Sequence, residues 1–242
     1  YCTKQPYSTA IHDSSHKRLL LYIMIDAALA LTLAWLLAFH LLPPRVPLPV
    51  RIVVVFALGW AALGGAAHVT AAAALGHVAV ALIARRVPLH LWSYLSTQAA
   101  HIVVIAAVVV WMPDAFAHGL WAAYAATLHP LAILLGGVIA ATLMGGPAVG
   151  LLMAPWRAAA QIEGLDNAGR IIGLMERALI YLMVMIGEPT GIGFLIAAKS
   201  ILRFETASRD QKASEYVIIG TLASFGWALA WGFAAQSLIA AL

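Results

Sequence analysis

The segment Gly173–Phe204, GLMERALIYLMVMIGEPTGIGFLIAAKSILRF, is almost entirely apolar and yet contains formal charges along its whole length. A membrane-spanning helix needs about 20 mostly apolar residues, and a charged side chain at the middle of a bilayer costs roughly 2.5–3.5 kcal/mol or more. We therefore expect these residues to form membrane helices whose charges pair with one another. The charged residues are Glu176, Arg177, Glu188, Lys199 and Arg203.

The composition of the chain indicates the same environment. Of its 242 residues, 63% are hydrophobic and 10% are charged, whereas about 25% of the residues of a soluble domain are charged. A soluble fold of this size exposes too much surface to hide so many apolar side chains. We therefore predict an all-α integral membrane protein with the lipid bilayer as a partner. The sequence has no stretch of interleaved basic and aromatic residues, so we predict no nucleic-acid partner. It has a single cysteine, Cys2, so we predict neither a disulfide framework nor a cysteine-based metal site.

We predict a polytopic transmembrane helical bundle of about six or seven spans that forms a single domain, residues 1–242. The apolar runs are continuous and lack a two-residue alternation, which favours helices over a barrel. The predicted spans are Leu19–Leu42, Ile52–Ala84, Leu91–Met112, Leu131–Met153, Ile171–Gly187, Thr190–Phe204 and Tyr216–Leu242.

Two of these regions have an ambiguous length. Ile52–Ala84 would form a helix of about 50 Å at 1.5 Å per residue, so we expect it to tilt, protrude or break, with Gly64-Gly65 as the preferred break. Phe116–His129 is short and ends at Pro130, so we expect it to lie at the membrane interface or to extend the following helix.

The basic residues fall mainly on one side of these seven spans. Only Arg45 and Arg51 fall on the other side, and Arg177 lies inside a helix. The positive-inside rule then makes the richly basic side cytoplasmic, so we expect a cytoplasmic N-terminal segment, residues 1–18, and a C-terminus on the outer side. The residues on the basic side are Lys4, Lys17, Arg18, Arg85, Arg86, Arg157, Arg170, Lys199, Arg203, Arg209 and Lys212.

Residues 168–215 predict a short charged hairpin followed by an amphipathic cytoplasmic segment. Pro189 favours a helix stop and restart, and a turn there places Glu176 level with Arg203 and one turn from Lys199. We expect Glu176 to pair with Arg203 or Lys199 across the hairpin, and Arg177 to snorkel towards the cytoplasmic interface.

The second arm of the hairpin has only eight residues, Gly191–Ala198, before Lys199. We expect it to surface early and to continue as an amphipathic helix through KSILRFETASRDQKASEY. Two interpretations of the charged cluster stay open. The charges either pin a short hairpin at the membrane boundary or form a polar pocket for a headgroup or substrate.

Nine histidines are candidate ligands for haem or a metal. His68 and His77 lie nine residues apart and hence on opposite faces of a helix, so they cannot share one ion. His77 and His101, on neighbouring spans, form an alternative haem or metal site, although no cofactor is predicted. His40, His118 and His129 are expected nearer the outer side. The simpler interpretation of each histidine is that it packs within the protein and forms a hydrogen bond.

Asp26, in LLLYIMIDAALAL, is the carboxylate most deeply embedded in an apolar run. An ionisable residue within a membrane is by default a candidate for function. The alternative is that Asp26 accepts a hydrogen bond from Tyr22, one turn earlier.

Three segments resemble the C-terminal half of the domain-of-unknown-function 3307 family, a group of bacterial multi-pass membrane proteins. They are GRIIGLMERALIYL, GFLIAAKSILRF and SEYVIIGTLASF, and the resemblance covers about residues 168–232. It implies a helical protein of the bacterial inner (cytoplasmic) membrane, in a family without a settled activity.

The N-terminal half resembles this family more loosely. YCTKQPY is similar to the end of a family motif in which Gln5 matches a glutamine. LGHVAVALIARR retains His77 of a His-x-x-x-Asp segment but has Ala81 at the acid. LSTQAAH retains Gln98 and His101 of an Asp-Gln-x-x-His segment but has Thr97 at the acid. With Asp26, the retained residues His77, Gln98 and His101 form a candidate intramembrane polar site.

These features favour a structural or accessory subunit of a larger membrane assembly over an enzyme. Two carboxylates of the family pattern are missing, and small-residue stretches such as ALGGAAH and LLGGVIAATLMGG suit close helix packing, including packing against other membrane subunits. The alternative is an intramembrane enzyme or a lipid or small-molecule handler that uses a His/Asp/Glu polar cluster. A transporter is disfavoured because no internal repeat is visible.

Overall fold

The computed structural model describes residues 23–42, 46–160, 167–207 and 211–242, which are predominantly helical and include no strand. The chain divides into two compact units. Unit 1 comprises residues 1–83 and 98–132, and unit 2 comprises residues 84–97 and 133–242. Because each unit is described by itself, the predicted single domain stays a prediction.

The all-α membrane architecture is confirmed in its broad form, since 5 described helices are long and apolar enough to cross a bilayer. Two of the predicted spans, Ile171–Gly187 and Thr190–Phe204, are not among these helices, and the apolar helix within the second, Thr190–Lys199, is shorter. The long apolar helices are Ile23–Leu41, Ala67–Ala84, Leu91–Trp111, Ala122–Ala159 and Gln211–Ala240.

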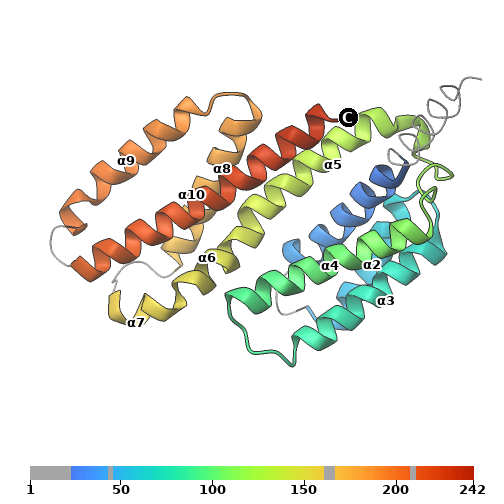
Figure 1. Ribbon diagram of the computed structural model, residues 1–242, viewed down its shortest axis with the longest axis horizontal. Helices are drawn as coiled ribbons and strands as arrows, with labels where there is room; N and C mark the ends of the chain where they lie inside the picture. The colour runs from blue at the N-terminus through green and yellow to red at the C-terminus, as the bar shows by residue number, and fades with distance from the viewer. Residues whose placement is uncertain (1–22, 43–45, 161–166, 208–210) are drawn as a thin grey trace, which may run out of the picture. The chain divides into compact units, whose positions relative to one another are not determined.

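Unit 1 is built from a helix hairpin beside two longer helices (Figure 1). The first described helix, Ile23–Leu41, ends in a π-helical turn, η1 (Leu37–Leu41). The hairpin consists of α2 (Leu48–Ala62) and α3 (Ala67–Ala84), and α4 (Leu91–Trp111) follows. Ala38, Val55 and Ala74 form a small core where the first helix meets both arms.

The break at Gly64-Gly65 is confirmed, and it is a complete reversal of the chain. Gly64 (φ +67°) and Gly65 (φ +120°) adopt backbone conformations that L side chains rarely adopt. The Gly65 N–H bonds to Trp60 O and the Gly64 N–H to Ala61 O, both at 3.1 Å. This pair of bonds is the Schellman motif, which ends a helix at a left-handed glycine.

The turn is also held by a distant segment, and this contact leads to a prediction. A Cβ at Gly64 would lie 2.3 Å from Leu120 N, whereas a Cβ at Gly65 would meet nothing within 4 Å. We expect Gly64→Ala to lower the free energy of unfolding by about 2–3 kcal/mol, and Gly65→Ala, which adds strain without the collision, by less. Unfolding in mixed detergent micelles measures both. Equal losses would show that the approach of Leu120 does not matter.

The reversal corrects the predicted distribution of charge. In the first helix, Leu31 faces the Gly59–Thr70 contact and Trp35 faces His77, so α3 runs parallel to this helix. The end of α3 therefore lies at the same end of unit 1 as Leu41. Arg51 lies there too, because its guanidinium donates to Phe39 O at 3.0 Å and Leu42 O at 3.3 Å.

It follows that Arg51 lies at the same end of unit 1 as the end of α3, and not at the opposite end as predicted. The same reversal places the start of the first helix, Ile23, at the end opposite to the end of α3. The prediction had put both on one side because it treated Ile52–Ala84 as a single crossing. Arg45 and residues 1–18 fall outside the described residues.

The predicted segment Phe116–His129 is divided. Its first part forms turns and a short 3-10 helix, η2 (Ala122–Tyr124), and its second part belongs to α5 (Ala125–Ile139), which continues through Pro130. Extension of the following helix is thus confirmed for Ala125–His129. The helix continues through a π-helical turn, η3 (Ala140–Met144), into α6 (Gly145–Met153), η4 (Ala154–Trp156) and α7 (Arg157–Ala160).

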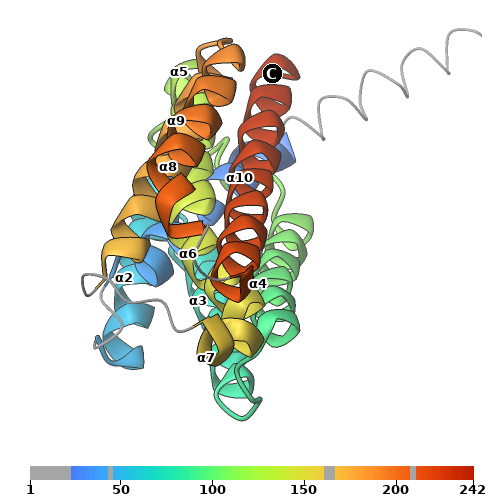
Figure 2. The same ribbon diagram turned by 90° about the vertical axis from the view of Figure 1, so that its left-hand side faces the viewer.

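Unit 2 packs the end of this long helix against three others (Figures 1 and 2). They are α8 (Ala168–Met185), α9 (Thr190–Ala207) and α10 (Gln211–Ala240). α10 packs mainly along α8, around a core of Ile180, Val184, Ile192, Phe225 and Ala228. The predicted continuation of the second arm as a helix is confirmed as far as Ala207, where α9 ends. The last residues of the predicted amphipathic segment, from Gln211, begin α10 instead.

The described basic residues at helix ends share one end of unit 2. Arg177 contacts Ser224 while Val184 contacts Gln236, so α8 runs parallel to α10. Arg177 also contacts Thr142 while Tyr181 contacts Leu134, so α8 runs antiparallel to α5–α6. Arg157 after α6, Arg170 at the start of α8 and Lys212 at the start of α10 therefore lie together. We call this the basic end.

Candidate functional site

Unit 1 contains a buried histidine pair that is contributed by α3 and α4. His77 Nδ1 lies 2.9 Å from His101 Nδ1, and the two residues are 1% and 2% exposed. One of these nitrogens must carry the proton that the other accepts, so the two rings share a hydrogen bond. The prediction that His77 and His101 lie on neighbouring helices is confirmed.

Aromatic side chains of the first helix enclose this pair. The centroid of the Trp35 ring lies 6.3 Å from that of His77 and 5.3 Å from that of His101. The Phe39 ring lies 6.1 Å and 5.0 Å from the same two rings. Because Trp35 and Phe39 are four residues apart, one face of the helix presents both.

His40 belongs to this cluster, although the sequence placed it nearer the outer side with His118 and His129. Its ring lies 5.6 Å from that of Trp35, and its side chain lies near Gln98 of α4 without a hydrogen bond that satisfies His40 Nε2 or Gln98 Oε1. The segment WLLAFH could have predicted this position of His40, because Phe39 and His40 follow Trp35 by four and five residues and the three lie near one face of a helix. We call Trp35, Phe39, His40, His77, Gln98 and His101 the histidine cluster.

Three buried polar atoms of the histidine cluster have no hydrogen-bond partner within the described parts of the chain. They are Trp35 Nε1, His40 Nε2 and Gln98 Oε1. A buried polar atom without a partner costs about 1–3 kcal/mol, so such a group in a folded protein calls for an explanation. The cluster therefore has the donors and acceptors to hold a small polar group.

Among the described residues, no group of three or more His, Cys, Asp or Glu side chains is placed to hold a metal ion. His77 and His101 direct their Nδ1 atoms at each other. Haem or a metal at this pair stays an untested alternative to the prediction of no cofactor.

Asp26 forms a separate pair outside the histidine cluster. Its Oδ1 lies 3.3 Å from His129 Nε2, and the His129 ring contacts Phe116 at 5.6 Å between centroids. Asp26 precedes Trp35 by nine residues, or about 13 Å of helix. The predicted site is thus divided: His77, Gln98 and His101 come together and Asp26 does not join them. The alternative partner, Tyr22, lies outside the described residues.

The hydrogen bond of the histidine pair can be tested by replacing one ring or both. We expect His101→Leu to lower the free energy of unfolding by about 1–2 kcal/mol, because His77 then loses its partner in a buried position. Replacement of both residues by Leu should recover part of this loss. His68→Leu, at an exposed position of the same helix as His77, is the control and should change stability by less than about 0.5 kcal/mol.

Unit 2 contains the second candidate site, in the α8–α9 hairpin. α8 ends in another Schellman turn, in which the Glu188 N–H bonds to Met183 O at 2.9 Å and the Gly187 N–H to Val184 O at 3.1 Å. α9 begins directly after Pro189. The predicted stop and restart at Glu188-Pro189 is confirmed.

Across this hairpin, Lys199 Nζ lies 2.6 Å from Glu176 Oε2, and the two side chains are 18% and 11% exposed. The ammonium group also lies 5.3 Å from the centre of the Phe225 ring of α10, within the range of a cation–π interaction. The predicted pairing of Glu176 is confirmed for Lys199. The side chain of Arg203, the other predicted partner, lies outside the described ones.

Arg177 does not snorkel to the interface, and that prediction is wrong. The residue is 4% exposed. Its Nε and Nη2 donate to Thr142 O at 3.3 and 3.1 Å, and its Nη1 donates to Ser224 Oγ at 3.1 Å. Internal acceptors on two helices thus replace the water and headgroups that snorkelling would have supplied.

The π-helical turn η3 explains why these acceptors are available. A π turn interrupts the regular i→i−4 ladder and leaves carbonyls open to other donors. Arg177 bonds to Thr142 O, and Trp227 Nε1 donates to Ala140 O at 2.9 Å. The turn is therefore completed by side chains of α8 and α10.

Glycines make room for the Arg177 side chain. A Cβ at Gly145 would lie 2.9 Å from Arg177 Cδ, and one at Gly173 would lie 3.1 Å from its Nη1. The small residues of LLGGVIAATLMGG predicted close helix packing. One of them, Gly145, also makes room for the buried side chain of Arg177. The contacts of Glu176, Arg177 and Lys199 favour the interpretation in which the charges pin the hairpin.

In comparisons with known proteins, no family model, no curated protein and no solved structure matches the chain, so the resemblance to the domain-of-unknown-function 3307 family stays a prediction.

Proposed function

We propose that this protein is a structural or accessory subunit of a larger membrane assembly in the bacterial inner membrane. The observation that carries the proposal is that the charged side chains of the hairpin have partners within the protein. Glu176 pairs with Lys199, and Arg177 bonds to neighbouring helices, so these charges stabilise the fold. In contrast, 22% of the most apolar 18-residue stretch of α4 is buried, and the same share of that of α10. Such uncovered faces suit contact with lipid and with other membrane subunits.

Photocrosslinking in native membranes tests this function. A photoreactive residue at Val103 of α4 or Leu222 of α10, both exposed, is expected to form an adduct with one defined membrane protein. The same residue at Val109, which is buried on α4, is the control and should give no such adduct. Adducts with lipid alone at both exposed positions would contradict the proposal.

We further propose that the basic end faces the cytoplasm, in agreement with the positive-inside rule. The first described helix would then start on the outer side, contrary to the expectation from the sequence. The five long helices, together with α2, α8 and α9, would give eight crossings, which put both Ile23 and the end of α10 on the outer side. In a Cys2→Ser background, a cysteine at Arg86 should resist a membrane-impermeant thiol reagent in intact cells, whereas one at His118 should react.

The alternative function, an intramembrane enzyme or a lipid or small-molecule handler, is favoured by the unpartnered atoms of the histidine cluster. Elemental analysis and the absorbance spectrum of protein purified from its native membrane test it. Stoichiometric metal or haem that disappears in His101→Leu and persists in His68→Leu would support this function over an accessory role.

A further inference from the structure

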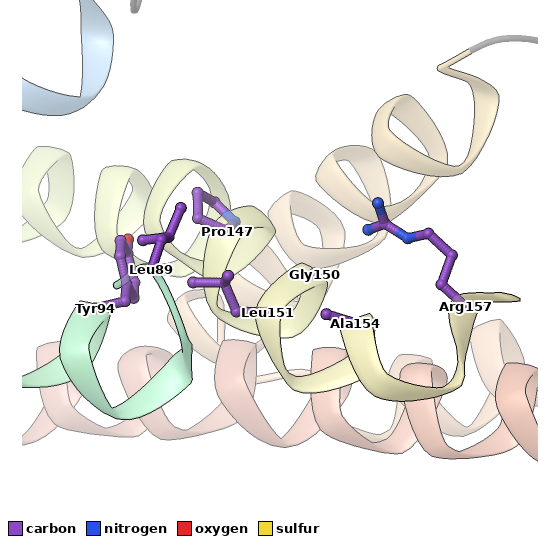
Figure 3. Close-up of a pocket in the computed structure, with 7 residues that line it drawn as sticks. All are labelled: Leu89, Tyr94, Pro147, Gly150, Leu151, Ala154 and Arg157. Carbon is purple, nitrogen blue, oxygen red and sulfur yellow. The ribbon is translucent and has the colours of Figure 1, made fainter. Parts of the chain in front are cut away.

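Unit 2 has an apolar groove that none of the sites above uses (Figure 3). Its volume is about 450 Å³, within the range of pockets that hold small molecules. Apolar groups form most of the wall, and Arg157 is the one charged residue among the described residues that line it. The other lining residues are Leu89, Tyr94, Pro147, Gly150, Leu151 and Ala154.

The groove follows the long helix from Pro147 to Arg157, a distance of about 15 Å at 1.5 Å per residue. Half of a bilayer core of about 30 Å has the same depth. Arg157 stands at one end, apart from the cluster of Leu89, Tyr94, Pro147 and Leu151 (Figure 3). The groove therefore matches one leaflet in depth and has its cation where a lipid headgroup would lie.

The Arg157 end of the groove also carries an aromatic residue that suits the membrane surface. Trp156, beside Arg157, is exposed, and tryptophan is enriched at the membrane–water interface. This arrangement complements an anionic headgroup above an apolar chain.

The wall is fixed before any ligand arrives. The Ser93 N–H bonds to His90 Nδ1 and the His90 N–H to Ser93 Oγ, both at 3.0 Å, which is a reciprocal cap of α4. Tyr94 donates its hydroxyl proton to Met144 O at 3.2 Å. The loop that carries Leu89 is thus attached to the helix that carries Arg157, and little ordering is required on binding.

We propose that this groove binds an anionic phospholipid, with one acyl chain between Leu89, Tyr94 and α6 and with the headgroup phosphate at Arg157. Gly150 provides the space for the chain, since a Cβ there would meet nothing within 4 Å. The proposal does not depend on the accessory function, because such a lipid would be bound by this chain alone.

Native mass spectrometry of the full-length protein tests the groove. The protein is released from nanodiscs of equal parts phosphatidylglycerol and phosphatidylcholine with identical acyl chains. We expect wild-type protein to retain phosphatidylglycerol preferentially. Gly150→Leu should reduce this retention about tenfold, because the larger side chain fills the groove. Gly226→Leu, an equally open glycine on the exposed side of α10, should retain the lipid.

The headgroup contact is tested separately. Arg157→Gln should lower phosphatidylglycerol binding about fivefold and leave phosphatidylcholine binding unchanged, whereas Arg170→Gln, an exposed cation at the same end, should leave both unchanged. Equal retention by wild-type protein and Gly150→Leu, or an unaltered headgroup preference in Arg157→Gln, would overturn the proposal. Circular dichroism of each variant establishes that it is folded.

Discussion

Arg177→Ala is expected to lower the free energy of unfolding by about 4 kcal/mol, the largest effect of any substitution considered for this protein. The change removes three hydrogen bonds, two to Thr142 O and one to Ser224 Oγ. Hydrogen bonds between membrane helices contribute about 0.6 kcal/mol on average and up to about 1.7 kcal/mol. The lost side chain also leaves a cavity among Gly145, Gly146 and Gly173, which adds to the cost.

Two further variants separate the charge of Arg177 from its geometry. Arg177→Lys keeps the charge but lacks the planar fork that reaches both acceptors, so we expect it to recover less than half of the loss. Arg170→Ala, an exposed position on the same helix, is the matched control and should change stability by less than about 0.5 kcal/mol. Chemical unfolding in mixed detergent micelles gives each value. If Arg177→Ala and Arg170→Ala lose the same stability, the internal role assigned to Arg177 is wrong.

Lys199→Met is expected to lower the free energy of unfolding by about 3 kcal/mol. The substitution keeps most of the side-chain volume but leaves Glu176, which is 11% exposed at its side chain, without its cation. Removing one partner of a buried ion pair costs about 3–5 kcal/mol, whereas replacing both is often close to neutral. We therefore expect the double variant Glu176→Gln/Lys199→Met to unfold within about 1 kcal/mol of wild-type protein.

The double-mutant cycle gives this prediction its control. If the two residues interact as the 2.6 Å contact indicates, the losses of the single variants will not add in the double variant. Additive losses would show that Glu176 and Lys199 stabilise the fold independently. Thermal unfolding of each variant in the same detergent provides a second measurement of the same differences.

The sequence predicted those contacts that depend on spacing along a few turns of helix. The pairing of Glu176 with Lys199 follows from a turn at Pro189 and from the helical repeat. The opposite faces of His68 and His77 follow from the same repeat. Such contacts are local, so the chain between the two residues determines them.

Contacts made by distant segments were not predictable in this way. A break at Gly64-Gly65 is compatible with a kink or with a reversal, and the close approach of Leu120 accompanies the reversal. The inward course of Arg177 depends on an open carbonyl in η3 and on Ser224, 47 residues later in the chain. His40 enters the histidine cluster only because the first helix packs parallel to α3.

The ion pair across the α8–α9 hairpin also constrains how the protein is made. α8 would enter the bilayer before Lys199, the partner of Glu176, and Ser224, one of the two partners of Arg177, exist. Lys199 is translated 23 residues after Glu176, and Ser224 is translated 47 residues after Arg177. The two helices consequently have to enter the lipid together, as one electrically balanced unit, and α10 must then join them to complete the environment of Arg177. Assembly of this half of the protein is thus delayed until α10 has left the ribosome.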